Sequence, residues 1–160
     1  VRQVTGLPKF NAKSKCMIAL AFITPRVDSP MESKTRIATT KYGLPPAVTN
    51  YTVPGATFSN GAPITLDLAW PEFRVAIEYD GDHHRTDKNQ WRRDNDKREL
   101  LRHHHWIVII ATAANMADEP SQAELAYRVG RQLALRGAVF DFTLTATPLD
   151  ELARRRRRRI

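Results

Sequence analysis

Cysteine is almost absent from this sequence, because Cys16 is the only one among 160 residues. A single thiol cannot form an internal disulfide, and it cannot supply the paired cysteines of a zinc site. We therefore expect a reducing, cytoplasmic setting. Long apolar runs are missing as well. The longest, residues 17–23, is far shorter than the roughly 20 residues that span a bilayer, so we expect a soluble chain without a membrane partner.

Several catalytic signatures are also missing. The sequence has no glycine-rich phosphate loop, no Gly-x-Ser-x-Gly elbow and no cysteine–histidine pair. These patterns mark P-loop NTPases, serine hydrolases and cysteine nucleophiles. Their absence leaves the acidic side chains as the best candidates for chemistry.

The excess of positive charge is small except at one end of the chain. The net charge is +8, but six of the 25 basic residues are the consecutive arginines 154–159. The rest of the chain has 19 basic and 17 acidic residues, a net charge of +2. Such a tail either binds a polyanion or is a solvated end with no assigned partner.

Helix boundaries can be predicted from capping residues. Ser29 is a suitable N-cap, Pro30 suits the first helical position, and Gly43 can end the helix. A second, highly charged helix is expected from Thr86 to about residue 102. A third is expected to be capped by Ser121, with Glu124 in capping-box spacing, and to end at Gly137.

Strands are predicted at residues 47–53, 64–69, 73–80 and 106–110. The short connection at residues 70–72 makes the middle two an antiparallel hairpin. The unbroken apolar run 106–110 is typical of a buried central strand. Alternating apolar residues at 140–144 suggest a short extra strand. The sequence therefore predicts an α/β fold with a mixed central sheet flanked by helices.

Acidic residues occupy unexpected places on this hairpin. Glu78 and Asp80 lie two residues apart, so they share one face of a strand. Asp67 lies on the preceding strand, within about two positions of Glu78 across the ladder. Acids are depleted in strands, and neighbouring carboxylates repel each other unless a positive charge lies between them. A bound divalent cation is the simplest explanation, and the alternative is a group of solvated acids at a sheet edge.

Four segments, in this order, resemble one known family. They are Asp28-Ser-Pro-Met-Glu32, Leu66-Asp-Leu-Ala-Trp-Pro-Glu72, Ala76-Ile-Glu-Tyr-Asp-Gly-Asp-His-His-Arg85 and Leu101-Arg-His-His-His-Trp-Ile-Val-Ile-Ile110. They are similar to an uncharacterised endonuclease-like domain family that is related to the very-short-patch mismatch repair endonucleases. That family belongs to the PD-(D/E)XK nuclease superfamily. The resemblance covers residues 28–115 and extends more weakly to residue 137.

The resemblance implies a restriction-endonuclease-like core of order αβββαβ and Mg²⁺-dependent cleavage of DNA, with Mn²⁺ as an alternative cation. Asp67 matches the metal-binding aspartate of the superfamily, Glu78 matches its (D/E)XK acid, and Glu32 matches an acid of the first helix. Asp80 stands where the superfamily usually has lysine, and it could serve as a third metal ligand or as a base. His84 is a further catalytic candidate.

The missing lysine leaves two questions open. His84, Lys88 or Gln90 could supply the lost donor, or the domain could be a non-catalytic nucleic-acid-binding module of the same fold, associated with an antitoxin or a regulator. Phosphate contacts are predicted for a set of basic residues on the second helix and in the tail. These are Arg85, Lys88, Arg92, Arg154, Arg155 and Arg156.

Three segments are expected along the chain. Residues 1–27 form an N-terminal extension or the remnant of an upstream domain. Residues 28–137 form the endonuclease-like domain, and residues 138–160 form a C-terminal extension with the arginine tail. The consecutive histidines 103–105 point in different directions at a helix end, so we do not expect them to bind zinc.

Overall fold

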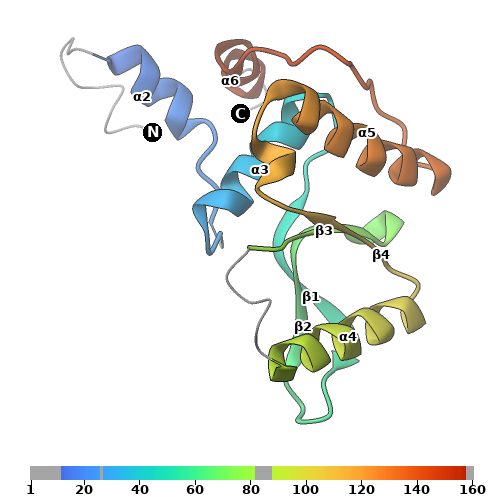
Figure 1. Ribbon diagram of the computed structural model, residues 1–160. Coiled ribbons are helices and arrows are strands. Elements are labelled where there is room, and N and C mark those ends of the chain that lie inside the picture. Colours follow the sequence, from blue (N-terminus) through green and yellow to red (C-terminus); the bar gives the residue numbers. More distant parts are fainter. Residues whose placement is uncertain (1–11, 26, 82–87, 158–160) are drawn as a thin grey trace.

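A four-stranded mixed sheet forms the centre of the chain, whose structure is a computed structural model (Figure 1). The structure describes residues 12–25, 27–81 and 88–157, without the side chains of 88–91 and 157. The strands are β1 (Val48–Thr57), β2 (Pro63–Trp70), β3 (Val75–Tyr79) and β4 (Ile107–Ala111), and they lie in this order across the sheet. The first three are antiparallel neighbours, while β4 runs parallel to β3.

Helices cover both faces of this sheet. Helices α3 (Pro30–Lys41) and α5 (Glu119–Leu135) lie on one face, and α4 (Lys88–His103) lies on the other (Figure 1). The order from α3 to β4 is therefore αβββαβ, and the prediction of an α/β fold with a mixed, helix-flanked sheet is confirmed.

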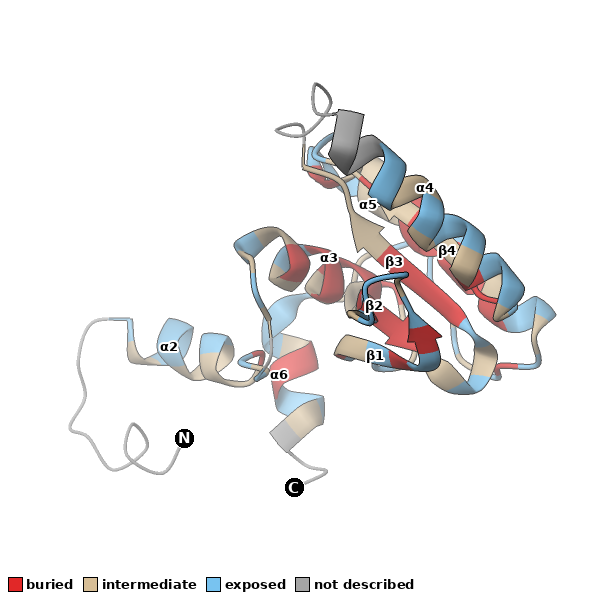
Figure 2. Cartoon of the chain, turned by 90° about the horizontal axis from the view of Figure 1, so that it is seen from below, coloured by how far each residue is buried: buried red, intermediate tan, exposed pale blue. Residues whose placement is uncertain are grey.

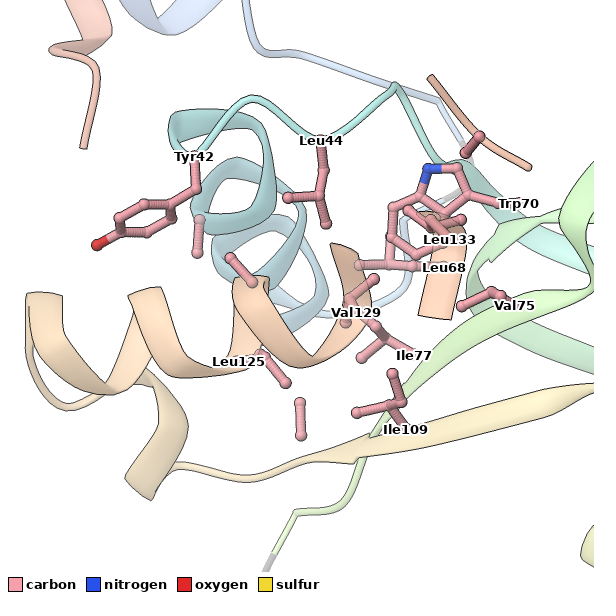
Figure 3. Close-up of a cluster of buried hydrophobic side chains, with 14 of the residues drawn as sticks. Tyr42, Leu44, Leu68, Trp70, Val75, Ile77, Ile109, Leu125, Val129 and Leu133 are labelled. Carbon is pink, nitrogen blue, oxygen red and sulfur yellow. The ribbon is translucent and has the colours of Figure 1, made fainter. Parts of the chain in front are cut away.

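Two apolar clusters hold these layers together. The larger one joins the sheet to α3 and α5 and includes Leu68, Ile77, Ile109 and Leu125 (Figure 3). The smaller one joins the opposite face to α4 through Leu101 and neighbouring apolar residues. Because β3 is buried on both faces, any polar group on it must lie where the strand leaves the core (Figure 2).

Helix α3 begins as its capping residues predict. The hydroxyl of Ser29 accepts a hydrogen bond from the Glu32 amide at 3.1 Å, and Pro30 is the first helical residue. Gly43 follows the helix with a φ of +87°. This φ favours glycine, and a Cβ at this position would lie 2.0 Å from the backbone oxygen of Asp141. Gly43 therefore both ends the helix and lets a distant segment pack against it.

The prediction that β4 is a central strand is wrong. Within the described part of the chain, β4 pairs only with β3 and forms one edge of the sheet. Its run of apolar residues has another cause, because α4 and α5 cover its two faces. Burial on both faces gives an edge strand the composition of a central one.

Two predictions near α5 are also wrong. The helix is capped by Asp118, whose carboxylate accepts the Ser121 amide at 2.8 Å, so the cap lies three residues before the predicted one. Residues 140–144 do not form a strand. Phe140 and Phe142 instead pack against the larger cluster, and Leu144 is exposed. Their alternation comes from a segment that lies on helices rather than in a sheet.

The two ends of the described chain meet beside α3. Helix α2 (Lys13–Leu20) precedes Phe22, which packs against Leu152 of α6 (Leu149–Arg157). Arg36 of α3 is buried and donates to the backbone oxygen of Phe22. Its pKa is lowered by burial and then by the nearby charge of Arg156. In the described ranges, no helix has the length and apolar character needed to cross a membrane.

Candidate acidic site at the end of the central strand

Asp67 lies where strands β2 and β3 separate. Their ladder runs from Trp70 opposite Val75 to Leu68 opposite Ile77. One position further, Oδ2 of Asp67 accepts the backbone N–H of Tyr79 at 2.9 Å, so a side chain takes a bond that a ladder would otherwise use. Burial raises the pKa of Asp67, and this hydrogen bond offsets only part of the effect. The carboxylate is held firmly in place but its charge is poorly compensated.

Glu78 lies beside Asp67 and faces helix α4. Ile77 and Val75 belong to the cluster on the opposite face, so strand alternation turns Glu78 towards α4. There its Oε1 forms an ion pair with Nζ of Lys97, and the two side chains are 18% and 21% exposed. Burial raises the pKa of Glu78, Lys97 lowers it, and the charge of Asp67 raises it.

Glu32 approaches the same place from the first turn of α3. It is buried, and its Oε2 accepts the backbone N–H of Asp28 at 3.0 Å. Asn50 Nδ2 in turn donates to the Asp28 carboxylate at 2.6 Å. Asn50 has a φ of +48°, and it is skipped in the β1–β2 register. A left-handed backbone at a single strand residue changes the direction of its side chain, and Asn50 reaches Asp28 at the start of α3.

Negative charge exceeds positive charge at this site. The charges of Glu32 and Asp28 raise the pKa of Asp67, while Lys97 alone among the surrounding side chains lowers it. Paired, part-buried carboxylates of this kind suit Mg²⁺, which is commonly held by one or two protein carboxylates together with water and substrate phosphate. Asp67 and Glu78 are therefore the side chains that could hold a divalent cation. Across the described ranges, no three His, Cys, Asp or Glu side chains gather closely enough to hold a metal ion.

Asp80 directly follows the end of β3, two residues after Glu78. Its backbone N–H donates to the Ala111 oxygen at 2.8 Å, which continues the link to β4. Of the predicted set, the site brings together Asp67, Glu78 and Glu32.

Several predicted residues lie outside the described residues. His83, His84 and Arg85 belong to the segment 82–87, and the side chains of Lys88 and Gln90 are likewise not described. Arg92 is exposed on α4. The three consecutive histidines lie at the end of α4, where His103 is near Glu99 and His105 has a φ of +59°.

The arginine tail is partly ordered by the chain itself. Arg154 and Arg155 each pair with an acid one turn earlier in α6, at 2.7 and 2.6 Å, and both remain exposed. Arg156 donates to the Ala21 oxygen at 2.9 Å and lies over the ring of Phe22. The three arginines predicted to bind nucleic acid therefore have different surroundings. Arg154 and Arg155 are exposed, whereas Arg156 links α6 to the end of α2.

Sequence reasoning missed Lys97. It lies four residues before Leu101, a buried residue that faces the sheet. Residues four apart share a face of a helix, so this spacing could have identified Lys97 as the cation facing the strand acids. Asn50 was also missed, and no local pattern marks it, because its role depends on contact with Asp28.

Comparisons with known proteins give distant relatives only. No family model matches the chain, and no solved structure matches it significantly. Two uncharacterised proteins of Mycobacterium tuberculosis, from strains CDC 1551 / Oshkosh and ATCC 25618 / H37Rv, are each 29% identical to it over 114 residues. The match covers 71% of this chain and 40% of each relative. The matched part of the chain thus spans well under half of the length of these relatives.

Proposed function

We propose that this chain is a Mg²⁺-dependent nuclease domain that hydrolyses phosphodiester bonds of DNA. The observation that supports this most is the grouping of Asp67 and Glu78 with Lys97 at the end of β3. The PD-(D/E)XK superfamily, which the sequence resembles, uses two carboxylates and a lysine at its catalytic site. In this proposal, Lys97 of helix α4 takes the role of the lysine that the superfamily usually has at the position of Asp80.

Each group has a role in this proposal. Asp67 and Glu78 would hold the cation, which neutralises charge on the phosphate and makes a bound water more acidic. Lys97 is placed to donate to a phosphate oxygen or to orient the attacking water, since its ammonium already reaches Glu78. Glu32 would orient water, because its carboxylate is fixed by the Asp28 amide close to Asp67.

DNA is proposed as the substrate because exposed cations lie apart from the acidic site. Arg92 lies on α4, the helix that also carries Lys97, and Arg154 and Arg155 lie on α6. Phosphate contacts of this kind position a duplex without reading its sequence. Relief of the i,i+4 pairs in α6 would free two guanidinium groups for phosphate.

Plasmid nicking tests this proposal. Supercoiled DNA is incubated with the protein in the presence and absence of Mg²⁺, and open-circular product is quantified. Asp67→Asn and Glu78→Gln should each lower the rate at least about 100-fold, as expected when a transition-state charge loses its partner. Glu99→Gln, at an exposed position on α4, is the matched control and should retain the rate. Undiminished Mg²⁺-dependent nicking by both site variants would exclude these residues as the catalytic acids.

A non-catalytic nucleic-acid-binding module is the second candidate. It is favoured by two observations: Lys97 already neutralises Glu78, and no third carboxylate completes a ligand set among the described residues. Titration calorimetry distinguishes the two candidates. Saturable Mg²⁺ binding that Asp67→Asn abolishes supports the nuclease, while DNA binding with no Mg²⁺ binding supports the module.

A further inference from the structure

Within the described residues, strand β4 has a neighbouring strand on one side only, and its backbone groups on the other side have no strand partner. The Ile107 amide donates to Arg74, and the Ala111 oxygen accepts from Asp80, so these two residues turn their backbone groups towards β3. In a parallel pair the residues that bond to the neighbour alternate. Val108 and Ile110 therefore direct their N–H and C=O groups away from β3, to the free edge of the described sheet.

The opposite edge of the sheet, strand β1, is protected against pairing with another strand, and the β4 edge is not. Strand β1 contains Pro54 and Gly55, a register irregularity, and Asn50 with a left-handed backbone. Proline, bulges and irregular backbone are the means by which proteins keep edge strands from pairing. The sequence of β4, Ile-Val-Ile-Ile-Ala, has no proline, glycine or charge. The β1 edge therefore has features that prevent pairing with another strand, whereas the β4 edge has none of them.

Grooves of nearly equal size flank β4 on its two faces. One, of about 430 Å³, lies between α4 and the strand and includes Val108, Arg98 and Arg102 in its lining. The other, of about 440 Å³, lies between α5 and the strand and includes Ile107 and Arg131. An added strand would place alternate side chains into these two grooves, because strand side chains alternate between faces.

We propose that β4 pairs antiparallel with β4 of a second copy of this chain, across a two-fold axis at Ile109. Centring the pair there places Val108 opposite the second copy's Ile110, and the outward backbone groups form about four hydrogen bonds. A rotation about an axis normal to the sheet keeps α5 of both copies on one face and α4 of both on the other. The sheet then continues through both copies.

The charges on α5 suit a second copy. The end of α5 lies near the start of β3, because Arg136 donates to the Phe73 oxygen at 3.0 Å, so α5 runs antiparallel to β4. Two copies of α5 are then antiparallel to each other. Glu124 and Arg131 are exposed, and they lie three residues before Tyr127 and three residues after Arg128, which line the groove beside Ile109. In this arrangement the Glu124 of each copy faces the other copy's Arg131.

Sedimentation equilibrium of the full chain, at concentrations from about 1 to 500 μM, tests the pairing. We expect a species of twice the 18.2 kDa monomer mass. Val108→Pro removes an outward amide only, and proline is tolerated on edge strands when its nitrogen faces solvent. It should raise the dissociation constant at least about tenfold while circular dichroism stays unchanged. A wild-type chain that remains monomeric throughout would overturn the proposal.

Charge exchange on α5 provides a second test that does not touch the sheet. Arg131→Glu should weaken the dimer, and Glu124→Arg should weaken it similarly, because each places like charges together. The double variant Glu124→Arg, Arg131→Glu should restore it. A dimer that is insensitive to Val108→Pro and to both single reversals would have to form through another surface, and it would contradict the pairing of β4.

Discussion

Replacement of Lys97 by methionine should destabilise the protein in a pH-dependent way. In the wild type, Lys97 pairs with Glu78 where about one fifth of each side chain reaches solvent. Lys97→Met leaves the carboxylate of Glu78 in this place without its cation, while the methionine stem still packs. Breaking a fully buried pair costs about 3–5 kcal/mol. Because this pair is partly solvated, we expect a loss of about 1–3 kcal/mol at pH 7.

The loss should grow as the pH rises. Burial raises the pKa of Glu78, and Lys97 is the main influence that lowers it. Without Lys97, the pKa in the folded state rises further above that of the unfolded chain. The folded state then keeps a proton that the unfolded chain has released. The stability that this bound proton gives to the folded state is fully present at pH values below the pKa of Glu78 in the unfolded chain. It is lost as the pH rises through the pKa of Glu78 in the folded state.

Urea unfolding followed by tryptophan fluorescence, at several values between pH 4 and pH 8, measures this effect. For Lys97→Met the midpoint should fall by about 0.5–1.5 M at pH 7, given a slope of roughly 2 kcal/mol per molar, and by much less at pH 4. The double variant Lys97→Met, Glu78→Gln has no unpaired charge and should recover part of the loss. Equal midpoints for Lys97→Met and wild type at pH 8 would refute the ion pair and its role in the site.

Four further variants have defined outcomes. His105→Gly should stabilise the protein by about 0.5–1 kcal/mol, because His105 follows α4 with a positive φ that favours glycine. Gly137→Ala, at the equivalent position after α5, should destabilise the protein by about 1 kcal/mol. Thermal denaturation measures both variants, and equal shifts of the two melting temperatures would contradict this effect of a positive φ. Gly43→Ala should cost about 2–5 kcal/mol, since its Cβ would meet a backbone oxygen at 2.0 Å, and urea unfolding checks this. Exchanging Arg154 and Arg155 for glutamine should flatten the slope of log DNA affinity against log salt by up to about two units, at roughly 0.9 per phosphate contact; an unchanged slope would mean that neither contacts DNA.

The parts of the fold that sequence predicts correctly depend on local chemistry. Ser29 and Pro30 define the start of α3 wherever the helix packs, and Gly43 ends it because few other residues adopt its φ. The hairpin of β2 and β3 follows from the short connection between two apolar runs. Asp67 and Glu78 could be placed together for the same reason, since hairpin pairing fixes which residues face each other.

The parts that sequence does not predict depend on contacts between distant segments. The place of β4 in the sheet depends on which strands pair with it, and its own sequence does not carry this information. Because helices cover both of its faces, β4 is as apolar as a central strand would be. Asp118 and Ser121 are both residue types that cap helices, and in the structure Asp118 caps α5. The partner of Glu78 depends on how α4 crosses the sheet, which brings Lys97 to it from 19 residues away.

Anomalous diffraction from crystals of this chain soaked in Mn²⁺ tests most directly whether Asp67 and Glu78 share one divalent cation. The proposed nuclease function predicts a single strong peak between the two carboxylates, about 2.0–2.6 Å from an oxygen of each, and no peak in crystals of Asp67→Asn. The absence of a peak at this place in wild-type crystals at saturating Mn²⁺, or a peak that persists in Asp67→Asn, would contradict it.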